Sequence, residues 1–130
     1  MGLIVQKYGG TSVADPDRIH AVADNVAITR RRGDDVIVVV SAMGKATDNL
    51  ISLADRVSRT QPGREMDMLL TTGERQTAAL MTMALADRGI EAVSYTGSQV
   101  GIITDTAHRK AKILEVKGDR VRQSLSEGKV

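Results

Sequence analysis

The pattern of hydrophobic and polar positions divides the first third of the chain into two strands with a helix between them. Leu3–Tyr8 is predicted to be a short buried strand, and Val36–Val40 is an unbroken series of β-branched residues. Between them, apolar residues recur at helical spacing after Asp15, the expected N-cap, and Gly33 marks the stop. Strands that are apolar on both faces are typical of parallel sheets with helices on each side.

The same pattern predicts two helices and a third strand in the middle of the chain. Thr47 is the expected N-cap of the first of these helices. Its expected buried face consists of Leu50, Ile51, Leu53, Ala54 and Val57. The second helix covers Arg64–Arg88, is interrupted at Gly73 and ends at Gly89. Ala92–Tyr95 is the expected third strand.

The remaining residues predict a small excursion and a closing helix. Ile102–Thr104 and Lys112–Val116 are weaker, shorter strands that we expect to pair with each other. Asp119–Glu127 is the expected final helix, with Gly128 as its stop. Residues 129–130 resemble the opening of another strand, so we interpret the chain as the front part of something longer.

The order of these elements predicts an α/β fold, namely a three-layer αβα sandwich with a mainly parallel sheet that is incomplete in this chain. Right-handed crossovers would bring the carboxyl ends of the strands to one edge, where ligands usually bind. Three glycine-containing turns fall at such ends, at residues 8–10, 41–44 and 95–98.

Composition narrows the classes of function. The chain has no Phe, no Trp and two Tyr, so we expect an aliphatic core and no aromatic stacking on nucleic-acid bases. Its 18 basic and 16 acidic residues give a net charge of +2, which we interpret as ordinary solubility. The absence of Cys excludes a disulfide scaffold. No apolar run is long enough to span a membrane and no secretion signal is visible, so we expect a cytoplasmic protein without nucleic-acid or membrane partners.

The stretch KYGGTS, at Lys7–Ser12, has the chemistry of a phosphate cradle. Gly9 and Gly10 let backbone N–H groups approach a ligand without obstruction by a Cβ, and such amides form anion-binding concavities. Lys7 could extend its ammonium group over a transferring phosphoryl group. An ordinary tight turn with an exposed lysine explains the same residues equally well, so both interpretations stand at this point.

Two hydroxyls and a carboxylate offer a second candidate site. Ser41 and Thr47 flank a glycine-containing turn whose following helix N-terminus favours a carboxylate, although simple N-capping also explains Thr47. Glu74 lies in an apolar helical pattern, where a carboxylate near a buried surface needs a partner. That partner is either a substrate ammonium group or a neighbouring arginine. His20 and His108 have no second ligand at metal spacing, so no metal site formed by the protein is expected.

Four segments together resemble the aspartate kinases of the amino acid kinase superfamily. They are VQKYGGTSV at 5–13, VIVVVSAMGKATD at 36–48, MLLTTGERQ at 68–76 and YTGSQVGIITD at 95–105. The segments stand in the order and spacing of that family, and the similarity extends across essentially all 130 residues. Among the aspartate kinases, the sequence most resembles bacterial enzymes of the actinobacterial type.

The resemblance implies an ATP-dependent kinase that phosphorylates the side-chain carboxylate of L-aspartate to 4-phospho-L-aspartate, the first step toward lysine, threonine and methionine. Lys7 would stabilise the transferring phosphoryl group, and Mg²⁺ would bridge the nucleotide phosphates. The implied nucleotide-binding residues are Lys7, Tyr8, Gly9, Gly10 and Ser41. The implied aspartate-binding residues are Ala46, Thr47, Asp48 and Glu74, the last of which would pair with the α-ammonium group. The acceptor carboxylate, with a pKa of about 3.9, is already ionised at neutral pH, so no general base is required.

The length departs from the pattern of the family. Its members continue with an RGGSDT-like segment, an SDVDG-like nucleotide loop and C-terminal regulatory domains. We therefore interpret residues 1–130 as the N-terminal part of the catalytic domain, and we expect the isolated chain to be inactive. The full-length protein is expected to be a homo- or hetero-oligomer. The alternatives are a related kinase of glutamate, acetylglutamate or UMP, and a non-catalytic truncated paralogue or small-ligand-binding remnant.

Overall fold

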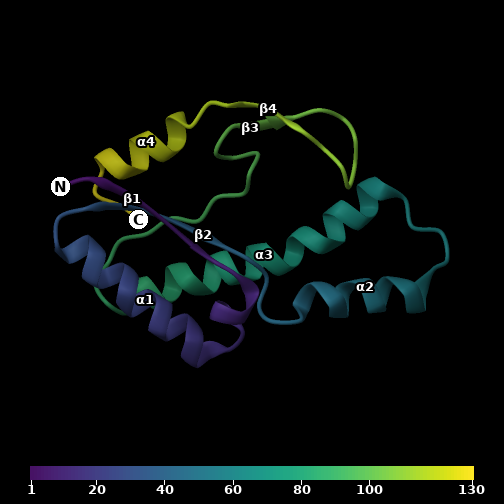
Figure 1. Cartoon of the computed structure of the whole chain (residues 1–130), viewed down its shortest axis with the longest axis horizontal. Helices are drawn as coiled ribbons and strands as arrows, with labels where there is room; N and C mark the ends of the chain where they lie inside the picture. The colour runs from purple at the N-terminus through teal and green to yellow at the C-terminus, as the bar shows by residue number, and fades with distance from the viewer.

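A pair of parallel strands joined by a helix opens the chain, for which a computed structural model describes residues 1–130 (Figure 1). Strand β1 (Leu3–Tyr8) pairs in parallel with β2 (Asp35–Val40), and helix α1 (Pro16–Arg31) makes the crossover. A short 3₁₀ turn, η1 (Gly10–Val13), stands between β1 and α1. The first two strands and the first helix predicted from the sequence are confirmed.

Helix α1 begins and ends where its capping residues predict. The Oδ1 atom of Asp15 accepts a hydrogen bond from the backbone N–H of Arg18 at 2.8 Å, and Pro16 is the first helical residue. Gly33 adopts a φ of +98°, a left-handed conformation that glycine reaches without a Cβ penalty. Local chemistry therefore fixes both ends of the crossover.

The core lies on one face of the two strands. Helices α1 and α3 (Gly63–Ala86) pack there against β2, whose Val36 is fully buried. The buried members of this core are Val13, Ile19, Val22, Ala23, Val26, Val36, Met81, Ala84 and Leu85. All of them are aliphatic or sulfur-containing, as the composition predicts, and burying their apolar surface is the main force that holds the helices on the strands.

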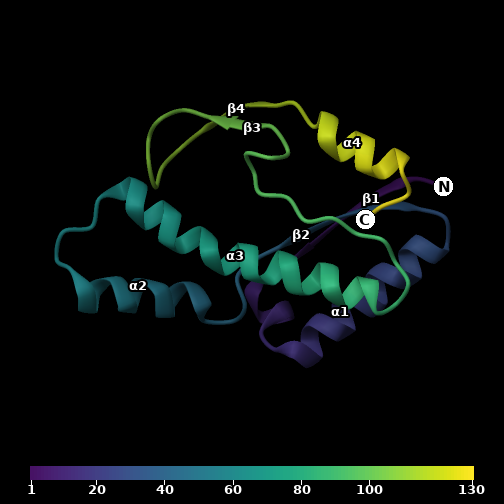
Figure 2. The ribbon, with the colours of Figure 1, turned by 180° about the vertical axis from the view of Figure 1, so that it is seen from behind.

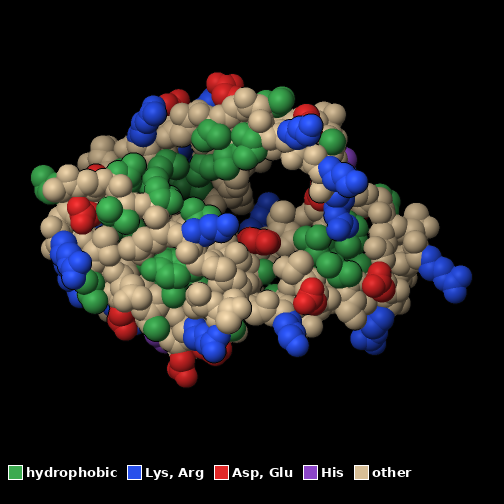
Figure 3. Space-filling model, viewed as in Figure 1, with side chains coloured by type: hydrophobic (Ala, Val, Ile, Leu, Met, Phe, Trp, Pro, Cys, Tyr) green, Lys and Arg blue, Asp and Glu red, His purple; other side chains and the backbone are tan.

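The opposite face of the strands is largely open. Partners in a parallel pair share a face, so Leu3, Val5 and Val39 lie on one side together. Their exposed fractions are 55%, 60% and 44%. The strands pass between α1 and α4 (Asp119–Ser126) in Figures 1 and 2, and Figure 3 shows hydrophobic side chains gathered where the strands run below α4. The two faces of the strands are therefore not equally covered, because α1 and α3 both pack on the face that carries Val36.

Helix α2 (Ala46–Val57) packs against α3 and has no buried residue. Figure 1 shows α2 and the first half of α3 extending away from the strands as a pair of antiparallel helices. The prediction that α2 buries its apolar face is therefore wrong for these residues, because the paired helices have no third element to pack against. Two of the expected core residues are exposed, namely Leu53 and Val57.

Helix α3 runs without interruption through Gly73, contrary to the sequence prediction. A Cβ atom added to Gly73 would lie 2.9 Å from the Cβ of Ala42, in the loop after β2. The glycine is therefore required by the close approach of that loop to the helix and not by a break in the helix. The helix ends before Gly89, which adopts a φ of +71° as predicted for a stop residue.

The segment Ala92–Tyr95 is not part of either sheet, so the predicted third strand is wrong as a sheet strand. The backbone around Ala92 pairs only with Val130. The Val130 N–H donates to the Glu91 carbonyl at 2.9 Å, and the Val93 N–H donates to the Val130 carbonyl at 3.0 Å. This is the hydrogen-bond pattern of a parallel pair. One pairing residue is too few to make a strand.

The excursion and the final helix are confirmed. Strands β3 (Ile102–Thr104) and β4 (Ile113–Val116) form an antiparallel pair, and α4 follows them. Gly128 adopts a φ of +80° after α4. The Tyr95 hydroxyl and the Ser124 hydroxyl lie 2.7 Å apart, which ties α4 to the segment that follows α3. None of the helices combines the length and the apolar character that crossing a membrane requires.

Candidate functional site

The turns that follow β1 and β2 are joined to each other. The Ser41 N–H donates to the Tyr8 carbonyl at 3.2 Å, and the Gly44 N–H donates to the Gly10 carbonyl at 3.0 Å. A Cβ atom on Gly10 would lie 2.9 Å from the Ala42 carbonyl oxygen, so only glycine fits at this position without a backbone shift. The two turns predicted from the sequence to share a sheet edge therefore form one surface.

Gly9 is the open position of this surface. Apart from the two chain neighbours of Gly9, no residue has an atom within 4 Å of a Cβ built on it, and the Gly9 carbonyl accepts the Ser12 N–H at 3.0 Å as η1 begins. The tight packing at Gly10 and the open space at Gly9 place bare backbone at the end of β1, where an anion can approach it. This geometry fits a phosphate cradle.

Lys7 reaches the same edge from the open face of the strands. It pairs in register with Val39 and is exposed. The Lys7 ammonium group takes part in none of the ion pairs of the chain. A lysine that is exposed and unpaired beside bare backbone is free to bind a phosphoryl group.

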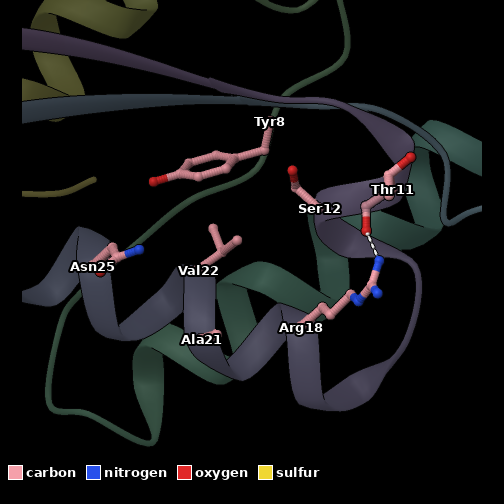
Figure 4. Close-up of a pocket in the computed structure, with 7 residues that line it drawn as sticks. All are labelled: Tyr8, Thr11, Ser12, Arg18, Ala21, Val22 and Asn25. Carbon is pink, nitrogen blue, oxygen red and sulfur yellow. Dashed lines mark hydrogen bonds between the residues drawn. The ribbon is translucent and has the colours of Figure 1, made fainter.

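Tyr8 directs its side chain to the other face of β1, toward α1 (Figure 4). There it borders a cavity of about 320 Å³. The cavity is lined by Tyr8, Thr11, Ser12, Arg18, Ala21, Val22 and Asn25. The Tyr8 hydroxyl donates to Oε1 of Gln6 at 2.9 Å, and burial raises the pKa of the Tyr8 phenol. The Arg18 side chain of α1 donates to the Thr11 carbonyl at 2.6 Å and so ties α1 to the turn η1.

The residues predicted to bind the acceptor lie at the start of α2. Lys45, and not Thr47, is the N-cap residue, and no side chain caps the helix. The prediction of a Thr47 cap is wrong because the Lys45 carbonyl already accepts the first bond of the helix, from the Asn49 N–H at 2.9 Å, so the helix starts two residues earlier. The Ala46 N–H bonds to the Met43 carbonyl at 2.9 Å. The Thr47 hydroxyl is therefore not used for capping. Thr47 and Asp48 belong to the first turn, whose N–H groups have no intrahelical acceptors.

Glu74 lies on α3, directly after the glycine that touches Ala42. Its side chain is exposed, which corrects the expectation of a carboxylate near a buried surface. It forms no ion pair, so the alternative of a structural pair with a neighbouring arginine does not occur. The contact between Gly73 and Ala42 brings the helix that carries Glu74 against the turn that begins at Ser41.

The two histidines, His20 and His108, contact side chains outside the turns after β1 and β2. The Arg88 side chain lies 3.3 Å from Nδ1 of His20 and 2.6 Å from a carboxylate oxygen of Asp24. His108 lies 3.2 Å from the Asp67 carboxylate. No group of three or more His, Cys, Asp or Glu residues is placed to hold a metal ion. The sequence analysis did not find the contacts of Asp67, because nothing in the spacing links residues so far apart.

The fold and the site define the class of this protein. It is an α/β protein in which a glycine turn follows a parallel strand that carries an exposed lysine, and a helix with an exposed glutamate touches the turn after the neighbouring strand. The sequence profile of the Amino acid kinase family matches residues 2–130, and the chain belongs to that family.

Within this family, the chain is similar to aspartokinases. The chain is 53% identical to an aspartokinase of Bacillus sp. (strain MGA3) over 130 residues, which are 100% of this chain and 32% of that protein. It is 54% identical to an aspartokinase of Mycolicibacterium smegmatis, over 100% of this chain and 31% of that protein. The crystal structure of aspartate kinase from Synechocystis matches with a TM-score of 0.84 and 48% identity, over 98% of this chain and 20% of that one. The chain thus spans about a third of the length of these curated relatives.

Proposed function

We propose that this chain supplies the acceptor side and part of the phosphate side of an aspartate kinase, which transfers the terminal phosphoryl group of ATP to the side-chain carboxylate of L-aspartate. One observation carries the proposal. The close contacts at Gly10 and Gly73 bring the end of β1, the turn after β2 and the helix that carries Glu74 together. The aspartokinases that match the chain supply the choice of reaction.

The phosphate side rests on the end of β1. The bare backbone at Gly9 and Gly10 would receive the phosphate oxygens, and the Lys7 ammonium group would offset the negative charge that the transferring phosphoryl group spreads over its oxygens. Ser41, hydrogen-bonded through its backbone to β1, would lie between nucleotide and acceptor. When bound with the nucleotide, Mg²⁺ would offset part of the negative charge of the phosphates.

The acceptor side rests on α2 and α3. The first turn of α2, with Ala46, Thr47 and Asp48, would orient the aspartate through the free N–H groups of Thr47 and Asp48 and through the Thr47 hydroxyl, which caps nothing. The exposed and unpaired Glu74 carboxylate would pair with the α-ammonium group of the substrate. Fixing both ends of the aspartate in this way would hold its side-chain carboxylate in line with the phosphoryl group, and such positioning is the main contribution of a phosphoryl-transfer enzyme.

A second candidate is a small-ligand-binding protein without catalysis. It would use the same candidate acceptor residues, at the start of α2 and on α3, without phosphoryl transfer. ATP as the nucleotide, L-aspartate as the acceptor, a homo- or hetero-oligomer and a cytoplasmic location are predictions from the sequence.

Calorimetry with L-aspartate tests the acceptor assignment. We expect aspartate to bind, and Glu74→Gln to weaken binding about tenfold, because a charge-assisted contact of about 1.5 kcal/mol is lost. Glu65→Gln is the matched control, since Glu65 is also an exposed glutamate of α3 but pairs with Arg64. Aspartate-dependent ATP turnover, measured in parallel, separates the kinase from the binding protein. Binding of glutamate, acetylglutamate or UMP in place of aspartate would show that the acceptor is misassigned.

A further inference from the structure

The hairpin of β3 and β4 has a glycine at each end, and we call the two ends, at Gly101 and Gly118, its stems. Gly101 precedes β3 with a φ of +80°, and Gly118 follows β4 with a φ of +69°. The stems are held side by side, because the Lys117 N–H donates to the Gly101 carbonyl at 3.1 Å and the Gly118 N–H donates to the Val100 carbonyl at 3.2 Å. A glycine at each leg of a hairpin gives it a place to hinge as one body.

The hairpin is itself a defined unit but is not part of the core. The Asp105 carboxylate accepts the Ala107 N–H at 3.1 Å and the Lys112 N–H at 3.2 Å, which closes the tip loop. The apolar side chains of β4 are nevertheless exposed, by 64% at Ile113 and 68% at Leu114. Core packing therefore does not hold the hairpin in place.

The tip of the hairpin is fastened to α3 by one carboxylate. The same Asp67 oxygen, Oδ2, lies 3.2 Å from Nδ1 of His108 and accepts the Arg109 backbone N–H at 3.2 Å. Arg109 has a φ of +68° and is the one non-glycine residue with a positive φ. A left-handed arginine costs free energy, so the contacts with Asp67 offset strain in the tip. Figure 1 shows the tip reaching the first turns of α3.

Asp67 and Glu74 lie on the same face of α3. They are seven residues apart, which is close to two full turns, and the rise between them is about 10 Å. Figure 3 shows a deep opening between the hairpin and α3, with Lys, Arg, Asp and Glu side chains at its rim. The side chains of Arg109, Lys110 and Lys112 form no ion pairs. The tip therefore adds positive charge near a face on which anionic substrates would bind.

We propose that residues 102–116 are a hinged lid over the Glu74 face of α3, and that Asp67 is the latch that holds its tip closed. The lid turns at Gly101 and Gly118 and opens when the contacts of Asp67 with His108 and Arg109 break. Asp67 is a positioning residue, since it acts through the hairpin. The role of the lid in admitting an anionic amino acid rests on the proposed function, whereas the latch itself does not.

Limited digestion with trypsin tests the latch on this chain. The tip offers cleavage sites after Arg109, Lys110 and Lys112, and the connector between α2 and α3 offers a reference site after Arg59. We expect Asp67→Ala, which removes both contacts, to raise the rate of tip cleavage about three- to tenfold relative to cleavage after Arg59. His108→Ala should raise the same ratio by less, because the Arg109 N–H contact stays.

The ratio of the two cleavage rates distinguishes a loosened lid from a loosened protein. Asp17→Ala, which removes an exposed carboxylate of α1, is the matched control and should leave the ratio unchanged. An unchanged ratio in Asp67→Ala would overturn the latch, including a case in which both sites are cleaved faster. Calorimetry with L-aspartate on the same variants is a separate readout, so absent binding would count against the proposed function and leave the latch result standing.

Discussion

Gly73→Ala tests whether the contact between α3 and the loop after β2 is as tight as the structure indicates. The added Cβ would lie 2.9 Å from the Cβ of Ala42, whereas carbon atoms pack best at about 3.5–4.0 Å. Overpacking of this kind costs about 1–3 kcal/mol. Replacing a glycine inside a helix with alanine stabilises the helix by about 1 kcal/mol, so the net loss expected in Gly73→Ala is about 0–2 kcal/mol.

The double-mutant cycle with Ala42→Gly isolates the clash from the gain in helix propensity. In the Ala42→Gly background the Cβ of residue 42 is gone, so Gly73→Ala should become stabilising by about 0.5–1 kcal/mol. The expected coupling energy is about 1–3 kcal/mol. Urea unfolding followed by circular dichroism gives all four free energies of unfolding. A coupling below about 0.5 kcal/mol would refute the argument, because it would mean that the two residues do not touch.

The remaining predictions concern α1. Asp15→Ala should lower the free energy of unfolding by about 1 kcal/mol, because the Arg18 N–H loses its 2.8 Å cap. Asp17→Ala, in the same turn without a capping contact, should cost less in the same urea titration. The hydrogen bond from Arg88 holds the pKa of Asp24 below its ordinary value, so its contribution to stability is present above about pH 4 and is lost as pH falls through the lowered pKa. The stability difference between wild type and Asp24→Asn should therefore shrink between about pH 5 and pH 3, and a constant difference would contradict this assignment.

The elements that local chemistry fixes were predicted from the sequence. The first two strands, α1, the β3–β4 pair and α4 each carry their own period, caps or stop residue. A cap such as Asp15 or a stop such as Gly33 acts within one turn, so one sequence contains the whole signal.

The elements that depend on distant partners were not predicted correctly. The segment Ala92–Tyr95 has the composition of a strand, but a strand forms only where a ladder of partners is present, and here Val130 is the sole one. The sequence predicts a helix break at Gly73, because a glycine alone does not reveal that Ala42 packs against it. The apolar face of α2 has the period of a buried helix, yet the burial depends on a neighbouring element.

The sequence names candidate site residues but does not show how the elements that carry them are brought together. Lys7, Gly9 and Glu74 are conspicuous in the sequence by residue type, and their roles are predictions that follow from the resemblance to aspartate kinases. What joins them is a set of small-residue contacts, in which Gly10 fits under the Ala42 carbonyl and Gly73 fits against the Ala42 side chain. Ala42 thus touches both the turn after β1 and the helix that carries Glu74. A larger side chain at position 42 would push that helix away from the turn after β2, because the contact at Gly73 leaves no room for further atoms. The position of α3 against this turn is therefore set by the size of one residue that carries no chemistry itself.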